Sequence, residues 1–389
     1  MAGNLELNII RTKYILIYAG QTWLAYFAVY LTHNGYTDQQ TAQLYGAYQF
    51  SLFFTVIIWG FLSDKYGVRK IYILAASISS LLLLLLPNIT GFTALAVYVV
   101  LLSVFLYGCS PMLDSITLHY VHSSKRSSYG ALRMFGAVGW GIASPSLGWL
   151  IDNFYPSLIF PYSSALLLIT ALLALWLLRL DKNKISGSPV KIKGVLYFFR
   201  GRLLLFLMII SFFGFCMAPI SHVITIYFKS LGASNTIVGI AFTMQTIAEI
   251  PLFFLGAWFI SRLGYKKVTY IAFFMGAVRL LYYGFSNEPL VAIWGGLLQG
   301  FTLSFFIIGV VEYVHKKVPL EWRSTGQALI WAFHFGAGYT LGHFWLGFVR
   351  NYYSMNEIMF IQAGLTFIAF LLLWWYFSTE KENVSIITT

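Results

Sequence analysis

Residues 93–120 read TALAVYVVLLSVFLYGCSPMLDSITLHY, a stretch in which Asp114 is the one charged residue. About 20 consecutive apolar residues are enough to cross the hydrocarbon core of a bilayer as a helix. The stretch therefore predicts a membrane-spanning helix that carries a carboxyl group inside the membrane. A charged side chain at that depth costs about 2.5–3.5 kcal/mol on insertion scales, so its presence points to function.

Three further charged residues lie inside long apolar stretches, namely Arg133, Glu249 and Arg279. Together with Asp114 they give each half of the chain one acid and one base. Charged residues within spanning helices face a protein interior or a water-filled cavity rather than lipid. The arrangement indicates a transporter with a polar central cavity.

The composition supports a membrane protein. Of the 389 residues, 59% are hydrophobic and 10% are charged, whereas a soluble domain carries about 25% charged residues. Aromatic residues make up 19%, which suits interfacial belts and an aromatic-lined cavity. The two cysteines, Cys109 and Cys216, fall in apolar stretches and are interpreted as packing residues instead of a disulfide.

Apolar stretches long enough to span the membrane recur along the whole chain, with short polar connections between most of them. The longest polar connection, residues 181–202, divides the chain into an N-terminal bundle (1–180) and a C-terminal bundle (203–389). Twelve spanning helices are predicted, at approximately 14–32, 42–63, 71–88, 93–120, 130–151, 159–179, 203–228, 238–260, 268–286, 289–313, 325–349 and 358–379.

The distribution of Lys and Arg predicts the orientation. If the N-terminus is cytoplasmic, the outer connections hold only Lys229 and Arg350, and the other basic residues outside the apolar stretches, Lys13 included, lie on the inner side. Cytoplasmic loops are enriched in Lys and Arg, so both termini are predicted to be cytoplasmic. The net charge of +12 is then explained by the Lys and Arg residues of the cytoplasmic connections, and no nucleic-acid partner is expected.

The connection between the second and third stretches reads Gly60-Phe-Leu-Ser-Asp64-Lys-Tyr-Gly67-Val-Arg69-Lys70. Gly60 allows neighbouring helices to approach closely, and Gly67 permits a tight turn. Asp64 can accept hydrogen bonds from a helix N-terminus or pair with an arginine. Arg69 and Lys70 favour the inner membrane surface.

This spacing, G-x-x-x-D-x-x-G-x-R-K, resembles the signature loop of the major facilitator superfamily. A degenerate second copy runs from Gly256 to Lys267, with Ser261 at the acidic position. The resemblance implies an all-α fold of two six-helix bundles with a solute site at their interface, which works by alternating access. The residues of the 60–70 loop would then be gating residues that stabilise the outward-facing state.

Within the superfamily, two stretches resemble lactose permeases: Pro111-Met-Leu-Asp114, and the helix from Tyr129 through Arg133 to Trp140. This resemblance implies that Asp114 and Arg133 hold the solute and that Trp140 stacks on a sugar ring. The same Asp and Arg look even closer to phenylpropionate permeases, which leaves an aromatic acid open as the solute.

The C-terminal half resembles the nucleoside–proton symporters. Glu249 precedes Ser261-Arg262 as their helix-eight glutamate does, and the connector from Glu312 to Arg323 matches theirs. The resemblance supports Glu249 as the proton carrier. The charge pair itself predicts that Arg279 tunes Glu249. The position of Glu312 near the inner end of its helix predicts that Glu312, paired with Arg323 or Lys316, acts in gating.

One departure concerns the tenth helix. Lactose permeases have a His and a Glu there that take part in proton coupling, and this sequence has Gln299 and Thr302 at what look like those positions. Gln299 is therefore assigned to solute binding. Glu249 remains the leading candidate for proton coupling, with Asp114 second.

The four buried charges are matched in depth. Asp114 lies about ten residues before the turn near Ser124 and Arg133 about nine after it, so both lie roughly 13–15 Å from the inner surface at 1.5 Å per residue. Glu249 and Arg279 are equally distant in sequence from Gly264. Desolvation favours a neutral carboxyl and a nearby guanidinium favours the charged form, so the acids could bind and release protons as a cavity opens and closes.

Several alternatives stay open. The two charge pairs could be static ion pairs that only join helices, and Trp140 and Gln299 could be packing residues. The histidines His222, His334 and His343 have no metal-ligand spacing and are interpreted as ordinary polar contacts. The sequence has no Walker loop and no His/Cys cluster, so neither an enzyme, nor a cofactor, nor ATP-driven transport is expected.

The function predicted from the sequence is proton-coupled import of a small polar solute, with a sugar or oligosaccharide first and a nucleoside second. Uptake of an aromatic acid, a drug-efflux proton antiporter and a non-transporting membrane sensor or scaffold are the alternatives. The expected setting is a bacterial inner membrane, and the expected functional unit is a monomer whose partners are the solute, protons and lipid.

Overall fold

The structure is a computed structural model that describes residues 2–124, 129–176, 201–319 and 323–380. Within these ranges the chain forms helices and connecting turns, with no β-strand. Ten stretches of the described residues are helical, long and apolar enough to cross a membrane. The chain is therefore an all-helical, multi-pass membrane protein.

The helices of the N-terminal half follow one another through short connections, with 3₁₀ turns at Leu86–Asn88 and Pro156–Leu158. They are α1 (Ala2–Gly20), α2 (Trp23–His33), α3 (Asp38–Phe50), α4 (Leu52–Tyr66), α5 (Val68–Leu85), α6 (Phe92–Ser124), α7 (Tyr129–Asn153) and α8 (Ile159–Trp176).

The helices of the C-terminal half are more often interrupted, by the 3₁₀ segments η4 (Ala218–Ile220) and η5 (Ile293–Leu297) and the π-helical segments η6 (Gly300–Ser304) and η8 (Ala332–Gly338). The α-helices are α10 (Gly201–Met217), α11 (Ile224–Ser230), α12 (Asn235–Phe254), α13 (Gly256–Phe285), α14 (Pro289–Ala292), α15 (Phe305–Lys317), α16 (Arg323–Trp331), α17 (Tyr339–Val349) and α18 (Met355–Ser378).

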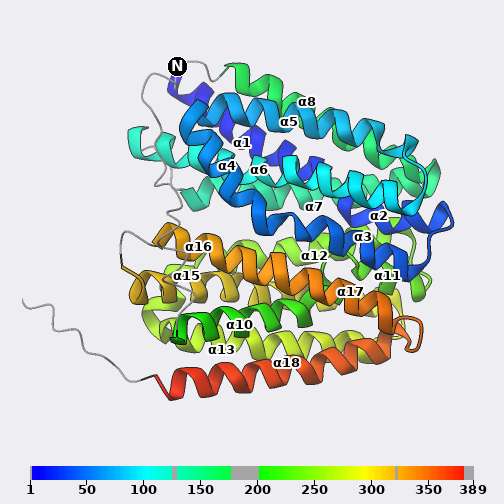
Figure 1. The fold of residues 1–389 in the computed structure, drawn as a ribbon, viewed down its shortest axis with the longest axis vertical. Coiled ribbons are helices and arrows are strands. Elements are labelled where there is room, and N and C mark those ends of the chain that lie inside the picture. Colours follow the sequence, from blue (N-terminus) through cyan, green and yellow to red (C-terminus); the bar gives the residue numbers. More distant parts are fainter. Residues whose placement is uncertain (1, 125–128, 177–200, 320–322, 381–389) are drawn as a thin grey trace, which may run out of the picture.

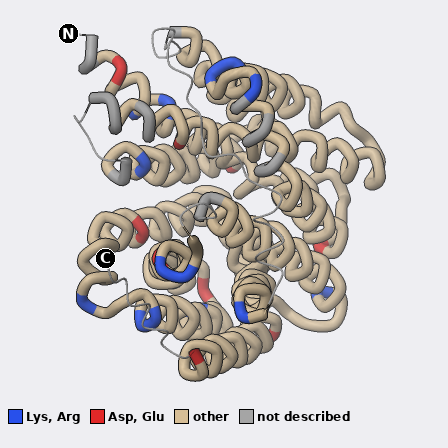
Figure 2. Tube along the Cα trace, turned by 60° about the vertical axis from the view of Figure 1, so that its left-hand side comes forward, with Lys and Arg blue, Asp and Glu red and all other residues tan. Residues whose placement is uncertain are grey.

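The two sets of helices occupy separate parts of the molecule. In Figure 1, α1 to α8 fill the upper part and α10 to α18 the lower part, and α1 begins on the same side on which α18 ends. Figure 2 brings that side forward and shows several basic residues on it. The predicted boundary between the halves, 181–202, falls mostly in residues 177–200, which lie outside the described residues, so the domain limits stay a prediction.

The count of twelve spans also stays a prediction. The two predicted stretches that are not among the ten spans, 42–63 and 325–349, are helical as well. The first is divided at Ser51, where α3 ends and α4 begins, and the second contains the π-helical segment η8.

The predicted turns at Gly67 and Gly264 occupy corresponding positions in the two halves. Gly67 ends α4 with φ +93°, and Gly264 has φ +76° within α13, where the helix changes direction. Side chains with a Cβ rarely adopt this left-handed region. Both copies of the loop motif therefore require glycine here.

Two helices are interrupted at equivalent places in the two halves. In the N-terminal half, α1 and α2 are separated by Gln21 and Thr22; in the C-terminal half, α10 and α11 are separated by residues 218–223. Interrupted helices in matching positions of two repeats are typical of transporter binding sites. A solute site at the level of these breaks and of the buried charges stays a prediction.

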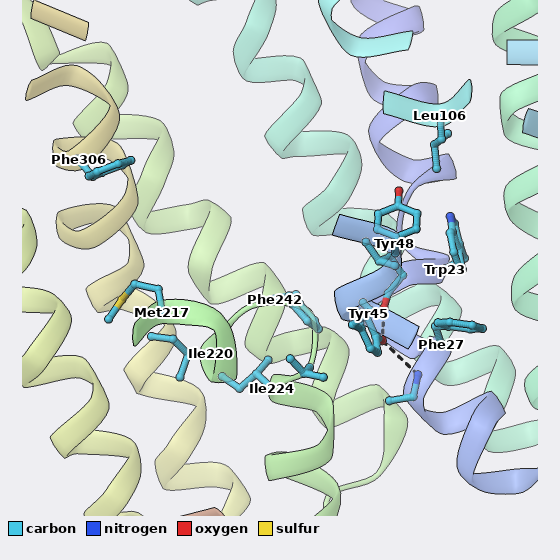
Figure 3. Packing of buried hydrophobic residues seen from close by; sticks show 14 of the residues in the cluster. Trp23, Phe27, Tyr45, Tyr48, Leu106, Met217, Ile220, Ile224, Phe242 and Phe306 are labelled. Atoms are coloured by element: carbon cyan, nitrogen blue, oxygen red, sulfur yellow. Dashed lines mark hydrogen bonds between the residues drawn. The ribbon is translucent and has the colours of Figure 1, made fainter. Parts of the chain in front are cut away.

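Aromatic and aliphatic side chains fill the interior on both sides of the interface. Trp23, Phe27, Tyr45 and Tyr48 form one group, with the ring centroids of Trp23 and Phe27 5.2 Å apart. Figure 3 shows this group facing Ile220, Ile224 and Phe242 of the other half. Tyr45 satisfies its hydroxyl by donating to the Leu24 carbonyl at 2.6 Å, so its burial leaves no unpaired polar group.

Direct polar contacts join the halves at the end remote from Ala2 and Ser378, which we call the closed end. The Asp152 carboxylate of α7 accepts hydrogen bonds from the backbone nitrogens of Asn235 (2.9 Å) and Thr236 (2.8 Å) at the start of α12. The side chains of both residues donate to it as well, at 2.8 and 2.7 Å. Arg350, after α17, pairs with Asp38 of α3 at 3.0 Å.

Glycines let α7 and α12 touch along this end. A Cβ at Gly148 would come within 2.3 Å of the Asn235 carbonyl oxygen, and a Cβ at Gly239 would come within 2.4 Å of Pro145. The Tyr26 hydroxyl lies at the same junction and donates to the Ser144 carbonyl at 2.5 Å. Only glycine permits this approach, so the structure is in a state with the closed end shut.

The structure corrects one assignment from the sequence. Lys13 was counted among the inner-surface charges, but its side chain is 0% exposed and lies within the N-terminal half. Its ammonium is 4.0 Å from the centroid of the Tyr72 ring and has no hydrogen-bond partner. The reason is that α1 extends in the N-terminal direction beyond the predicted start at residue 14, which turns Lys13 into the bundle.

Candidate functional site

The first charged cluster of the site lies in the N-terminal half, on α1, α6 and α7. Arg133 Nε is 3.6 Å from Asp114 Oδ1, and the Tyr14 hydroxyl donates to the same oxygen at 2.7 Å. The Arg133 guanidinium also lies over the Tyr18 ring, 4.6 Å from its centroid. The match in depth predicted from sequence spacing thus brings Asp114 and Arg133 into contact.

This cluster is reached from open space even though it lies in the middle of its helices. The side chains of Arg133 and Asp114 are 35% and 26% exposed. A guanidinium presents its donors in a planar fork that suits carboxylates and adjacent hydroxyls. A cation on an aromatic face is stabilised by about 0.5–2 kcal/mol, so Tyr18 helps to hold Arg133 in this position.

The second charged cluster lies in the C-terminal half, on α12, α13 and the segment before η6. Arg279, 1% exposed, donates from Nη1 to the side-chain oxygen of Gln299 and lies 5.5 Å from the centroid of the Tyr283 ring. Gln299 in turn shares a side-chain hydrogen bond with Glu249. Gln299 therefore bridges the predicted pair, with its carbonyl toward the base and its amide toward the acid.

This bridging differs from the direct contact that the sequence suggests. Glu249 and Arg279 interact electrostatically, but no ion pair within 4.0 Å joins these two described side chains. A neutral amide between two opposite charges keeps both hydrogen-bonded while weakening their direct attraction. The carboxyl group can then change its protonation state without leaving Arg279 unpaired.

The two clusters lie within electrostatic range of each other across the interface. Glu249 interacts electrostatically with Arg133 of the other half as well as with Arg279. Next to them α7 and α12 cross closely, since Thr243 Oγ1 donates to the Gly141 carbonyl at 2.6 Å. One acid and one base from each half therefore form a single charged layer across the middle of the molecule.

Trp140 lies toward the closed end from this layer. Its ring centroid is 5.5 Å from that of His222 and 6.0 Å from that of Phe242, both in the C-terminal half. The predicted stacking face of Trp140 is thus next to protein in this state. His222 was not predicted as a site residue, although Pro219, which interrupts the helix beside it, is a sequence signal for such a site.

The predicted gating residues are distributed over the end that carries the termini. Arg69, 8% exposed, donates from Nε to the Ala174 carbonyl at 2.8 Å and so caps the end of α8, while Lys70 is exposed. The surroundings of Gly60, Asp64 and Arg323 lie outside the described part of the structure.

Glu312 pairs with Lys316 at 3.5 Å. This is the second of its two predicted partners. Both residues lie on α15, so the contact joins one turn of a helix to the next. An exposed pair of this kind contributes only about 0.3–0.5 kcal/mol. It does not lock the two halves together.

Asp152 is a further residue that sequence reasoning missed. Its carboxylate caps the start of α12 from another helix, and a lone Asp at a helix end carries no signal of such a distant partner. Across the described residues, no group of three or more His, Cys, Asp or Glu side chains is arranged to hold a metal ion.

The comparisons with known proteins agree with this geometry. The chain is 27% identical over 330 residues to the uncharacterized transporter YwbF of Bacillus subtilis, covering 84% of this chain and 81% of that protein. It is 27% identical over 315 residues to the maltose permease of Geobacillus stearothermophilus, covering 78% and 79%. A structure of the nucleoside transporter NupG superposes with a TM-score of 0.81 at 16% identity, covering 98% of this chain and all of that one, and shares its fold.

A model of the MFS_1 like family matches residues 7–362. That match spans both halves, both charged clusters and both copies of the loop motif. The relatives named above are transporters. The chain therefore belongs to the MFS_1 like family, within the major facilitator superfamily.

Proposed function

We propose that this transporter imports a small polar solute together with protons by alternating access. The solute would be a sugar, an oligosaccharide or a nucleoside, as in the maltose permease and the nucleoside transporter that it resembles. The observation that carries the proposal is the charged layer, in which Glu249 of one half interacts with Arg133 of the other. Because the charged layer contains residues of both halves, movement of the halves apart separates Glu249 from Arg133.

The proposed architecture has twelve spans in two bundles, residues 1–180 and 203–389, joined by a cytoplasmic linker at 181–202. Both termini would be cytoplasmic, which is supported by the basic residues on the side where α1 begins and α18 ends (Figure 2). With this orientation the closed end faces outward. The state described is then inward-facing, in a monomer embedded in a bacterial inner membrane.

Asp114, Arg133 and Gln299 would bind the solute. The partly exposed Asp114 and Arg133 present an acceptor and a planar donor fork to solute hydroxyls. Tyr14 orients Asp114 through its 2.7 Å hydrogen bond. Gln299 reaches the same layer from the other half, so a solute that bridges the two clusters holds the halves together.

Glu249 would carry the proton, and Arg279 would tune it through Gln299. A proton on Glu249 removes the negative charge that faces both Arg133 and Arg279. Electrostatic attraction across the interface then weakens, because a neutral carboxyl has no net charge for the two guanidinium groups to attract. Protonation therefore changes the relative stability of the open and closed arrangements, which is what coupling requires.

The test is uptake of labelled maltose and uridine into proteoliposomes with an alkaline interior. The proposal expects accumulation of at least one solute above its external concentration, and loss of that accumulation when a protonophore dissipates the gradient. Equal internal and external concentrations with the gradient intact would contradict proton coupling. Accumulation only with an acidic interior would instead show an antiporter.

Substitution of the solute-binding residues gives a second test. Arg133→Ala leaves Asp114 without its guanidinium, so we expect the KM for solute to rise more than tenfold, since truncating one partner of a charged pair costs about 2–5 kcal/mol. Tyr14→Phe removes one hydrogen bond and should raise the KM about two- to tenfold. An Arg133→Ala protein with the KM of the parental protein would refute the assignment.

A further inference from the structure

The helix interruption at 218–223 is held in place by side chains. Ser221 Oγ donates to the Ala218 carbonyl at 2.6 Å, and the Ser221 backbone nitrogen donates to the same oxygen at 3.1 Å, so Ser221 closes the short segment η4. His343 Nε2, on α17, lies 2.9 Å from the same Ser221 oxygen. Because the Ser221 proton is directed to Ala218, His343 Nε2–H is the donor of that second bond, and the His343 Nδ1 is an acceptor.

The interruption presents His222 to the other half. Its ring centroid lies 5.5 Å from that of Trp140 on α7, with the ring planes tilted by 43°. Figure 3 shows Ile220, Ile224 and Phe242 on the same side of the interface, around this break. His222 is thus a residue of the C-terminal half that closes over the aromatic ring of the N-terminal half.

Two ring nitrogens at this place have no partner. Nδ1 of His222 and Nδ1 of His343 are both buried without a hydrogen bond, and the His343 side chain is 0% exposed. Buried polar atoms in native structures are nearly always paired, so an unpaired one needs an explanation. Both nitrogens lie where the two halves meet. A hydrogen-bond partner that enters when the halves separate would explain why the two nitrogens are unpaired in the closed state.

The distance between the rings of Trp140 and His222 determines in which state a solute ring can enter between them. A ring inserted between two rings needs about 3.5 Å on each side, or roughly 7 Å between the outer centroids. The centroids of Trp140 and His222 are 5.5 Å apart. No ring fits between them in this state, and one fits only after the closed end opens.

We propose that Trp140 and His222 form the outer gate of the solute site, and that His222 is itself a solute-binding residue. When the closed end is shut, its ring covers Trp140; when that end opens, a ring-shaped solute takes its place on Trp140 and accepts or donates a hydrogen bond at the His222 nitrogen. A pyranose or a nucleobase has both the face and the polar edge that this requires. The solute-binding part rests on the proposed function, whereas the gate does not.

The gate is tested by labelling a buried position between the halves. Thr225 of α11 is 0% exposed and donates to the Ala25 carbonyl of α2 at 2.5 Å. The parental protein for the experiment is Thr225→Cys with Cys109→Ser and Cys216→Ser, purified in nanodiscs, and the measurement is its rate of reaction with N-ethylmaleimide. Opening of the closed end exposes the new thiol.

His222→Ala removes the ring contact, and the labelling rate should rise about two- to tenfold, the effect of losing one aromatic pair. His222→Phe keeps a ring and should label at the parental rate, which also shows that the site folds. His33→Ala, an exposed imidazole at the same end, is the matched control and should change nothing. Equal rates for His222→Ala and the parental protein would overturn the gate.

The solute contact is tested with His222→Phe in uptake of maltose and uridine. The ring remains but the nitrogen is lost, so the KM for whichever solute the parental protein accumulates should rise about two- to tenfold. An unchanged KM for His222→Phe would overturn the role of His222 in solute binding, but it would not contradict its role in the gate. If the variants label as expected but the parental protein accumulates neither maltose nor uridine, the gate is supported. That result would contradict both the proposed import and the proposed solute contact.

Discussion

At the residue scale, Gln299 is the neutral hydrogen-bonding group that lies between the buried Arg279 and Glu249. It accepts from Arg279 and bonds Glu249, so neither the fully buried base nor the acid lies without a hydrogen bond. A direct buried ion pair would have to offset the desolvation of both groups by attraction alone. With the amide between them, a change in the charge of Glu249 leaves the hydrogen bond of Arg279 intact.

Lys13 supplies a prediction at this scale. Its ammonium is buried, has no hydrogen-bond partner and lies on the Tyr72 ring. Lys13→Met keeps the length and the contact with the ring but removes an unpaired polar group, so the folded protein should gain about 1–3 kcal/mol. The measurement is the thermal unfolding midpoint in detergent.

Lys70→Met is the matched control, because Lys70 is exposed and an exposed substitution usually changes stability by less than about 0.5 kcal/mol. A lower unfolding midpoint for Lys13→Met than for the parental protein would mean that the ammonium is stabilised in the bundle, contrary to this account.

At the scale of elements, the sequence predicts the depth of each buried charge in the membrane. It predicts the interaction partner of only some of these charges. Helix rise is fixed at about 1.5 Å per residue, so Asp114 and Arg133 were expected at one level and they meet. The direction in which Gln299 points depends on η5 and η6, whose 3₁₀ and π geometry changes the rotation per residue. Sequence periodicity assumes a regular helix, so it could not place Gln299 between Glu249 and Arg279.

The start of α12 gives a prediction at the same scale. Asp152 accepts four hydrogen bonds from Asn235 and Thr236, and so acts as a helix cap supplied by the other half. In the Thr225→Cys protein, Asp152→Ala should raise the labelling rate about two- to thirtyfold, because a lost cap costs about 0.5–2 kcal/mol. Asp152→Asn retains one acceptor oxygen and should give a smaller increase.

A labelling rate for Asp152→Ala equal to that of the parental protein would show that the closed end is held by other contacts, of which the 3.0 Å pair of Arg350 and Asp38 is the next to remove.

At the scale of the whole molecule, the sequence predicted a helical membrane protein of two halves with a charged interface. The family match and the ten spanning stretches confirm a helical membrane protein of this superfamily, while the domain limits and the roles of the charged residues stay predictions. The closed end was not predictable, because it depends on pairs such as Arg350–Asp38 and Asp152–Asn235 that lie far apart in the chain. Such contacts exist in one state of a moving protein, and a sequence pattern encodes no single state.

The account depends most on Glu249 as the group that links protons to solute. Glu249→Gln keeps the size and the hydrogen bonding to Gln299 but cannot ionise, so it should uncouple movement of the solute from movement of protons. Glu288→Gln, an exposed acid at a helix start, is the matched control and should behave as the parental protein.

The deciding measurement compares two assays of Glu249→Gln in proteoliposomes, using the solute that the parental protein accumulates. We expect that labelled solute still exchanges with unlabelled solute across the membrane, while accumulation driven by a pH gradient is lost. Accumulation by Glu249→Gln equal to that of the parental protein would contradict it.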